Sequence, residues 1–176
     1  MKLDPFAVAA IRLLALTGAR LREILDAQWP QVDLGRGVLS LPDSKTGKKL
    51  IYLSAAASAI LAALPRVAFN PHVIPGAKEG AARVDIHRPW AAVTRAAGLE
   101  GLRIHDLRHS FASVGAGRSL GLPIIGKLLG HSQAATTHRY AHLHVDPLRQ
   151  AADAIGAEID AAMSRASEGD IVRLKT

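Results

Sequence analysis

Residues 104–143 read IHDLRHSFASVGAGRSLGLPIIGKLLGHSQAATTHRYAHL and concentrate basic, imidazole and phenol side chains among small and aliphatic ones. His105 and Arg108 are three residues apart, so a helix would place them on one face. Leu107 and Phe111 are four apart and share another face, which can enter a hydrophobic core. The stretch therefore predicts a helix that is anchored by its apolar side and presents an imidazole together with a guanidinium.

These side-chain types suit chemistry at a phosphate group. A guanidinium is a planar fork of donors that matches phosphate oxygens. An imidazole can move a proton near neutral pH, and a phenol such as that of Tyr140 can act as a covalent nucleophile. We therefore interpret the stretch as the centre of a phosphate-directed site.

Five short motifs resemble, in the same order, those of the tyrosine recombinases, the family of phage integrases and Xer-type recombinases. They are TGARLREIL (residues 17–25), SKTGKK (44–49), HDLRH (105–109), LLGHS (128–132) and RYAH (139–142). Any one motif alone is a weak signal, whereas all of them in one order are specific, and the resemblance covers residues 11–148. It implies an α+β, predominantly α-helical fold: the DNA breaking-rejoining fold of a tyrosine recombinase catalytic domain, with a small antiparallel β-sheet.

The resemblance also implies a nucleophile and two proton-transfer groups. Tyr140 would attack the scissile DNA phosphate, form a covalent 3′-phosphotyrosine and free a 5′-hydroxyl. His105 would be its acid/base partner, because a phenol of pKa about 10 must lose a proton. Lys45 would be the general acid for the leaving 5′-oxygen. Since the bond energy stays in the phosphotyrosine, a second DNA end can reverse the reaction without ATP.

The remaining matched residues would hold the phosphate. Arg20 and Arg108 would bind its non-bridging oxygens, and His131 would hydrogen-bond it, so no metal or other cofactor is expected. Residues expected to orient the site are Glu23, Asp106 and His109. Further DNA contacts are expected from Lys48, Arg103 and Arg139.

Simpler interpretations exist for several of these residues. Without the other motifs, Arg20 and Glu23 would be an ordinary surface ion pair. Lysines that flank a hairpin turn are commonly solvated, which is our interpretation of Lys48 and Lys49. A spacing compatible with zinc, without the carboxylate of an HExxH motif, occurs among three further histidines: His138, His142 and His144.

The bulk properties fit one basic domain. The chain has 176 residues, with 22 Lys plus Arg against 15 Asp plus Glu, a formal net charge of +7. This charge favours an anionic partner such as double-stranded DNA, although a merely basic protein would share it. The absence of cysteine excludes disulfides and thiolate metal sites. Because the sequence shows no signal peptide and no membrane-spanning apolar run, a cytoplasmic, nucleoid-associated protein without membrane contact is expected.

Periodicity and helix-breaking residues predict the order of the elements. Besides the HDLRH helix, helices are predicted over residues 6–16, 20–28, 54–64, 85–97, 123–129 and 134–141. Strands over residues 37–41 and 49–53 would form a hairpin whose turn, 43–48, presents Lys45. A long loop is predicted over residues 66–83 and a glycine-rich break over 115–121.

Residues 1–163 are predicted to form the catalytic domain and residues 164–176 a polar tail. The domain would end in an amphipathic helix over residues 148–163, which can dock on its own domain or, as is common in the family, on a neighbouring protomer. The family implies a homo-tetramer on DNA, and we expect a monomer in isolation. Its separate N-terminal DNA-clamping domain is missing, so we expect a catalytic domain cut from a longer integrase or a natural fragment.

The sequence thus predicts a site-specific recombinase of the integrase type, from a mobile genetic element, that cleaves and rejoins DNA strands. One alternative is a type IB topoisomerase-like nicking and closing enzyme, which shares the catalytic group. Another is a DNA-binding fragment without autonomous catalysis. A suicide-substrate assay would separate catalysis from binding alone.

Overall fold

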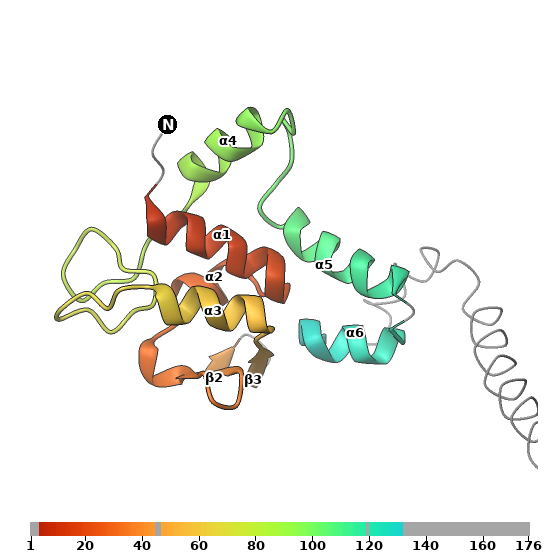
Figure 1. The fold of residues 1–176 in the computed structure, drawn as a ribbon, viewed down its shortest axis with the longest axis horizontal. Helices are drawn as coiled ribbons and strands as arrows, with labels where there is room; N and C mark the ends of the chain where they lie inside the picture. Colours follow the sequence, from red (N-terminus) through yellow and green to blue (C-terminus); the bar gives the residue numbers. More distant parts are fainter. Residues whose placement is uncertain (1–3, 45–46, 119, 132–176) are drawn as a thin grey trace, which may run out of the picture.

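The computed structural model describes residues 4–44, 47–118 and 120–131. Its elements, in chain order, are α1 (Pro5–Thr17), α2 (Leu21–Leu25), the 3-10 turn η1 (Trp29–Gln31), β1 (Val32–Asp33), β2 (Val38–Ser44), β3 (Gly47–Tyr52), α3 (Ala55–Ala63), α4 (His87–Ala96), α5 (Asp106–Gly117) and α6 (Leu122–Leu129). Figure 1 shows the helices grouped around α1, with α5 and α6 together on one side of the molecule. The predicted α-rich α+β fold is confirmed.

Helix α1 forms the centre of the larger hydrophobic core and contacts α2, α3, α4 and α5. It begins where the Asp4 side chain accepts a hydrogen bond from the Phe6 N–H, with Pro5 as the first helical residue. Its buried face includes Leu13 and Leu14, each about 2% exposed. It ends at Gly18, whose left-handed conformation (φ 63°) suits glycine. The helix predicted over residues 6–16 is therefore confirmed.

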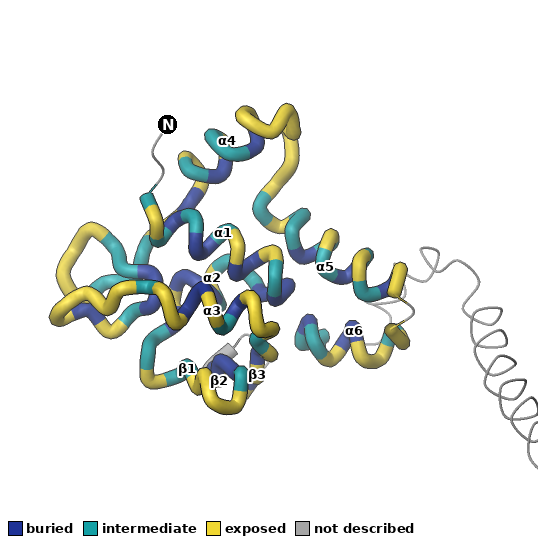
Figure 2. The backbone as a smooth tube through the Cα atoms, viewed as in Figure 1, coloured by how far each residue is buried: buried dark blue, intermediate teal, exposed yellow. Residues whose placement is uncertain are grey.

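The sheet is antiparallel in the order β1-β2-β3, and Leu39 on β2 pairs with Ile51 on β3. These two residues are buried, while Leu50 and Tyr52 on β3 are exposed. Figure 2 shows the burial of each part of the backbone, with exposed segments in yellow. The predicted hairpin is confirmed, and β2 is longer than expected. The sequence did not reveal β1, because a strand of two residues is too short to show alternation.

A smaller core lies between α5 and α6. Its buried residues are Ala112, Ala116, Ile125 and Leu129, with Phe111 and Leu122 packed against them. The break predicted over residues 115–121 begins too early, because α5 continues to Gly117. A Cβ at position 115 would lie 3.3 Å from a side-chain carbon of Ile125. Gly115 is therefore compatible with the helix and permits the close approach of α6.

Two further predictions differ in detail. The helix expected over residues 20–28 is shorter, because α2 ends at Leu25 and Gln28 joins His72 in an isolated β-bridge. The long loop over residues 66–83 is confirmed between α3 and α4. The remaining predictions lie outside the described residues. They are the helices over residues 134–141 and 148–163, the tail after them and the domain boundary at residue 163. Within the described ranges, no helix is long and apolar enough to cross a membrane.

Candidate functional site

Arg20 lies at the N-terminus of α2, directly after the turn that ends α1. Its backbone is extended, so it caps the helix instead of belonging to it. The Glu23 carboxylate accepts one hydrogen bond from the Arg20 backbone N–H at 2.8 Å and another from its Nη1 at 2.9 Å. The Arg20 side chain is 32% exposed, whereas that of Glu23 is 9% exposed. The pair therefore differs from an ordinary surface ion pair, since its acidic member is buried and holds both ends of the arginine.

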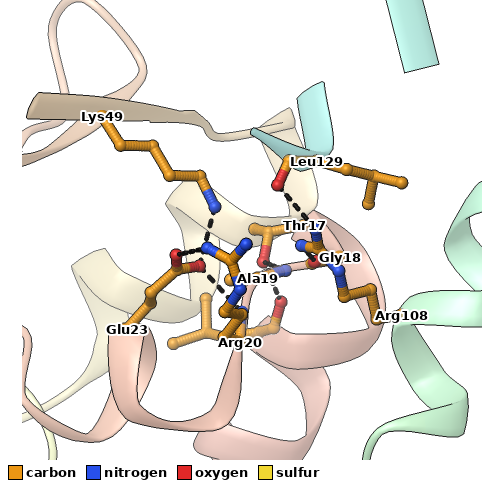
Figure 3. Close-up of polar contacts among 9 residues, drawn as sticks. Thr17, Gly18, Ala19, Arg20, Glu23, Lys49, Arg108 and Leu129 are labelled. Carbon is orange, nitrogen blue, oxygen red and sulfur yellow. Dashed lines mark hydrogen bonds and ion pairs between the residues drawn. The ribbon is translucent and has the colours of Figure 1, made fainter. Parts of the chain in front are cut away.

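Arg108 on α5 joins this turn to the end of α6. The residue is 5% exposed, and its Nη1 donates to the Gly18 carbonyl oxygen at 2.5 Å. Its Nη2 donates to the Leu129 carbonyl oxygen, at the end of α6, at 2.7 Å. Figure 3 shows Arg20 and Arg108 on either side of the short segment that leaves α1. Two arginines that are far apart in the sequence therefore meet at one junction.

Lys49 on β3 belongs to the same junction, which corrects its interpretation as a solvated lysine of the turn. It is 9% exposed, and its Nζ donates to Oε2 of Glu23 at 2.7 Å (Figure 3). The strand alternates, so the side chain at position 49 shares the buried face with Ile51. Lys48 is exposed, as expected.

Burial and neighbouring charges shift the pKa values of this ion pair. Burial alone raises the pKa of the Glu23 carboxyl, but hydrogen bonds from Lys49 and Arg20 outweigh burial, so the pKa lies below its ordinary value. Burial lowers the pKa of the Lys49 ammonium, and the Glu23 carboxylate offsets only part of this effect. The nearby positive charges of Arg108 and Arg20 lower the Lys49 pKa further. Three cations thus share a small volume with the Glu23 carboxylate in the part of the chain that is described.

His105 directly precedes α5, three residues before Arg108, and it is exposed. Its ring meets that of His109 edge-on, with 4.9 Å between centroids. Burial lowers the pKa of His105, and the neighbouring His109 and Arg108 lower it further. Asp106 raises the pKa of His105, although not enough to restore its ordinary value.

Asp106, the first residue of α5, forms an ion pair with Arg103 in the segment that leads into this helix. Its carboxylate accepts a hydrogen bond from the Arg103 backbone N–H at 2.8 Å and from the Arg103 guanidinium at 3.0 Å. This contact lowers the pKa of the Asp106 carboxyl. The Arg103 side chain is 76% exposed, which suits the predicted contact with a large anionic partner.

His131 follows the C-terminus of α6. Gly130 ends that helix in the left-handed conformation (φ 69°), and the His131 backbone N–H donates to the Gly126 carbonyl at 2.9 Å. A Cβ at position 130 would lie 2.7 Å from Cε of Lys49, so the turn that leads into His131 rests on the lysine side chain. His131, the candidate phosphate-binding histidine, is therefore one residue away from the contact with Lys49.

Four of the six predicted site residues lie in one region. Figure 3 shows Arg20 and Arg108 there, His105 interacts electrostatically with Arg108, and His131 follows Gly130, which lies against Lys49. The other two, Lys45 and Tyr140, lie outside the described residues, as do Arg139 and the three histidines considered for zinc. Sequence reasoning missed Lys49, although the strand alternation in KKLIY was a usable signal. A fork of guanidinium donors beside an ammonium group can bind a tetrahedral anion and stabilise charge that builds on its oxygens.

Comparison with known proteins identifies the family. Residues 6–146 match the model of the phage integrase family. Tyrosine recombinase XerC of Xanthomonas campestris pv. campestris is 34% identical over 152 residues, which are 83% of this chain and 47% of that protein. The chain therefore spans about half the length of the curated relatives it matches.

Solved structures share the fold. The XerH site-specific recombinase bound to its palindromic difH substrate, in a post-cleavage complex, matches with a TM-score of 0.70 and 22% identity over 86% of this chain and 47% of its own. The catalytic domain of bacteriophage HP1 integrase matches with a TM-score of 0.62 and 23% identity, over 82% of this chain and 79% of its own. The fold is thus that of a tyrosine recombinase catalytic domain, and the chain belongs to the phage integrase family.

Proposed function

We propose that this chain carries the catalytic domain of a site-specific recombinase, which cleaves and rejoins double-stranded DNA through a covalent 3′-phosphotyrosine. The observation that carries the proposal is the meeting of Arg20 and Arg108 at the junction between α1, α5 and α6. In this arrangement two guanidinium groups would bind one phosphate, and membership of the phage integrase family supports that role. The domain would extend over residues 1–163.

In this proposal the phosphate lies beside the cations at the junction of α1, α5 and α6. Arg20 and Arg108 bind its non-bridging oxygens, where negative charge builds in the transition state. Arg20 is held by Glu23 and remains partly exposed, so its guanidinium is accessible to DNA. His131 donates a hydrogen bond to the phosphate from the turn that follows α6. The exposed Arg103 and Lys48 contact the backbone farther along the duplex.

Proton transfer completes the reaction. Tyr140 attacks the phosphorus, and the bond to the 5′-oxygen breaks as Lys45 donates a proton to that oxygen. His105 accepts the proton of the phenol. The family membership and the position of His105 beside Arg108 support these roles.

Recombination also requires assembly on DNA. Structures of similar fold contain a recombinase bound to its DNA substrate. We propose that four copies of the protein assemble on DNA in the cell's nucleoid. In each copy, an N-terminal DNA-clamping domain would hold the DNA together with the catalytic domain. The amphipathic helix over residues 148–163 would dock on a neighbouring protomer in that assembly.

A suicide-substrate assay tests the proposal. The full-length protein is incubated with a pool of nicked duplexes in which the sequence around the nick is randomised. Cleavage near the nick releases a short strand that diffuses away, so the phosphotyrosine is trapped and migrates as an adduct on a denaturing gel. Sequencing of the trapped DNA then gives the target. Binding of the pool without any adduct would indicate a DNA-binding protein without autonomous catalysis.

Cleavage is expected to proceed unchanged in EDTA. The reason is that Arg20, Arg108 and Lys45 are proposed to supply the positive charge that metal ions supply in other phosphoryl-transfer enzymes. The rate of adduct formation is measured in excess chelator and again after Mg²⁺ is restored. A rate that collapses in EDTA and recovers with Mg²⁺ would contradict the proposed roles of these cations.

The rate of adduct formation is expected to remain high as the pH falls through the usual histidine range. His105 must be neutral to accept the proton of Tyr140, and its pKa is lowered by burial, His109 and Arg108. Its neutral form therefore persists below pH about 6.5, and the acid limb of the profile should lie below that value.

His105→Gln should lower the single-turnover rate by about 10²- to 10⁴-fold and remove the acid limb. The pH profiles of both proteins are measured at saturating DNA. An acid limb that persists unchanged in the variant would assign it to another group.

A further inference from the structure

Lys49 is the last residue of the SKTGKK motif, and its side chain is buried although the sequence predicts no role for it. Its side chain is 7% exposed, and its Nζ lies 2.7 Å from Oε2 of Glu23. Burying an ammonium group removes its hydration, which is costly unless a partner compensates. The neighbouring Lys48, by contrast, is exposed to solvent. The groups that Lys49 contacts must therefore compensate for its burial.

The partner of Lys49 is the carboxylate that also holds Arg20. Oε1 of Glu23 accepts from the Arg20 guanidinium, whereas Oε2 accepts from both the Arg20 backbone N–H and the Lys49 ammonium (Figure 3). One carboxylate thus divides its charge between two cations. Arg20 is therefore not fully neutralised by Glu23, and its partly exposed guanidinium keeps an excess of positive charge.

Lys49 also connects three parts of the site through packing. A Cβ at position 130 would lie 2.7 Å from Cε of Lys49. The methylene groups of Lys49 therefore pack against the turn before His131. Lys49 belongs to β3, which pairs with β2. Through Glu23 it reaches the N-terminus of α2. A shift of the Lys49 side chain would therefore affect the N-terminus of α2, where Arg20 lies, and the turn before His131.

We propose that Lys49 is a positioning residue of the recombinase site: by sharing Glu23 with Arg20 it sets the orientation and the available charge of the Arg20 guanidinium. This inference rests on the proposed function. Without the Lys49 ammonium, Glu23 turns its full charge toward Arg20, and the pair becomes neutral. A neutral pair binds a phosphate weakly and stabilises little of the charge that builds on its oxygens.

The main variant is Lys49→Met, which keeps the apolar stem and removes the charge. At saturating DNA it should form the adduct about 10- to 100-fold more slowly, the range seen when a residue that orients a functional group is lost. Lys78→Met is the matched control, because Lys78 is an exposed lysine of the loop between α3 and α4. It should leave the rate unchanged. Thermal unfolding of both variants shows that they are folded.

A second variant separates positioning from a purely structural role. Adding Glu23→Gln to Lys49→Met removes the unbalanced carboxylate but keeps an oxygen that can accept from Arg20. The double variant should therefore react faster than Lys49→Met alone. If Lys49 served only to stabilise the fold, the double variant would be equally slow or slower, and the proposal would be overturned. Lys49→Gln, which can still donate to Glu23, replaces Lys49→Met if the latter does not fold.

A readout without catalysis keeps this test separate from that of the proposed function. In ¹⁵N-labelled protein, the Arg20 Nε–Hε signal is identified by its loss in Arg20→Lys. Lys49→Met should shift that signal and Lys78→Met should not, even if the wild-type protein forms no DNA adduct. An Arg20 signal that is identical in Lys49→Met and wild type would overturn the positioning role, whatever the result of the cleavage assay.

Discussion

Tyr140→Phe is expected to abolish the covalent DNA adduct while leaving DNA binding nearly intact. Only the phenolic oxygen is lost, and that atom is the one proposed to form the bond to phosphorus. Loss of a catalytic nucleophile costs on the order of 10⁶ in rate in well-studied enzymes, which places the adduct below detection. The measurement is a denaturing gel of the suicide reaction, with binding followed separately by gel shift.

The chain offers a matched control, because it contains two tyrosines. Tyr52 on β3 is 56% exposed, and Tyr52→Phe removes the same atom from the surface of the sheet. That variant should form the adduct at the wild-type rate. An adduct that survives in Tyr140→Phe would exclude Tyr140 as the nucleophile, and its simultaneous loss in Tyr52→Phe would assign the reaction to the other phenol.

Arg108→Lys should reduce adduct formation by about 10²- to 10³-fold, comparable to the loss of one charge-stabilising donor. The charge is retained, so the salt dependence of DNA binding should change little. A lysine has a single nitrogen and cannot bridge the Gly18 and Leu129 carbonyls that the guanidinium joins. The variant should also be less stable by about 1–3 kcal/mol, because a buried carbonyl loses its donor.

The rate is measured at saturating DNA, and the free energy of unfolding is taken from denaturant titration. Arg95→Lys provides the control, since Arg95 is exposed on α4 and both quantities should stay at their wild-type values. A variant Arg108→Lys that is destabilised but cleaves normally would show that this guanidinium joins the elements without contacting the phosphate.

Much of the fold was predictable because its signals are local. Asp4-Pro5 and Gly18 mark the two ends of α1, which agrees with the helix predicted over residues 6–16. The hairpin follows from β-forming residues around a turn. Gly115 was misinterpreted because a glycine is ambiguous in sequence: it can end a helix, or it can admit a neighbouring helix, and only the packing of Ile125 decides between them.

The sequence indicated candidate site residues, but it did not indicate how they are connected. Motif order identified Arg20 and Arg108, but no local rule shows that Arg108 reaches carbonyl oxygens 90 and 21 residues away. Lys49 was missed because its neighbour in the turn, Lys48, suggested a solvated pair. The period of two in a strand would have placed position 49 with Ile51 on the buried face.

The bridge made by Arg108 also has a consequence during protein synthesis. The Gly18 carbonyl leaves the ribosome 90 residues before the guanidinium that binds it. At about 5–20 residues per second, this separation corresponds to roughly 5–20 s of translation. During that time the nascent chain carries the first arginine without the second. Until residue 108 has been made, the turn after α1 therefore lacks the hydrogen-bond donor that joins it to α5 and α6 in the finished fold.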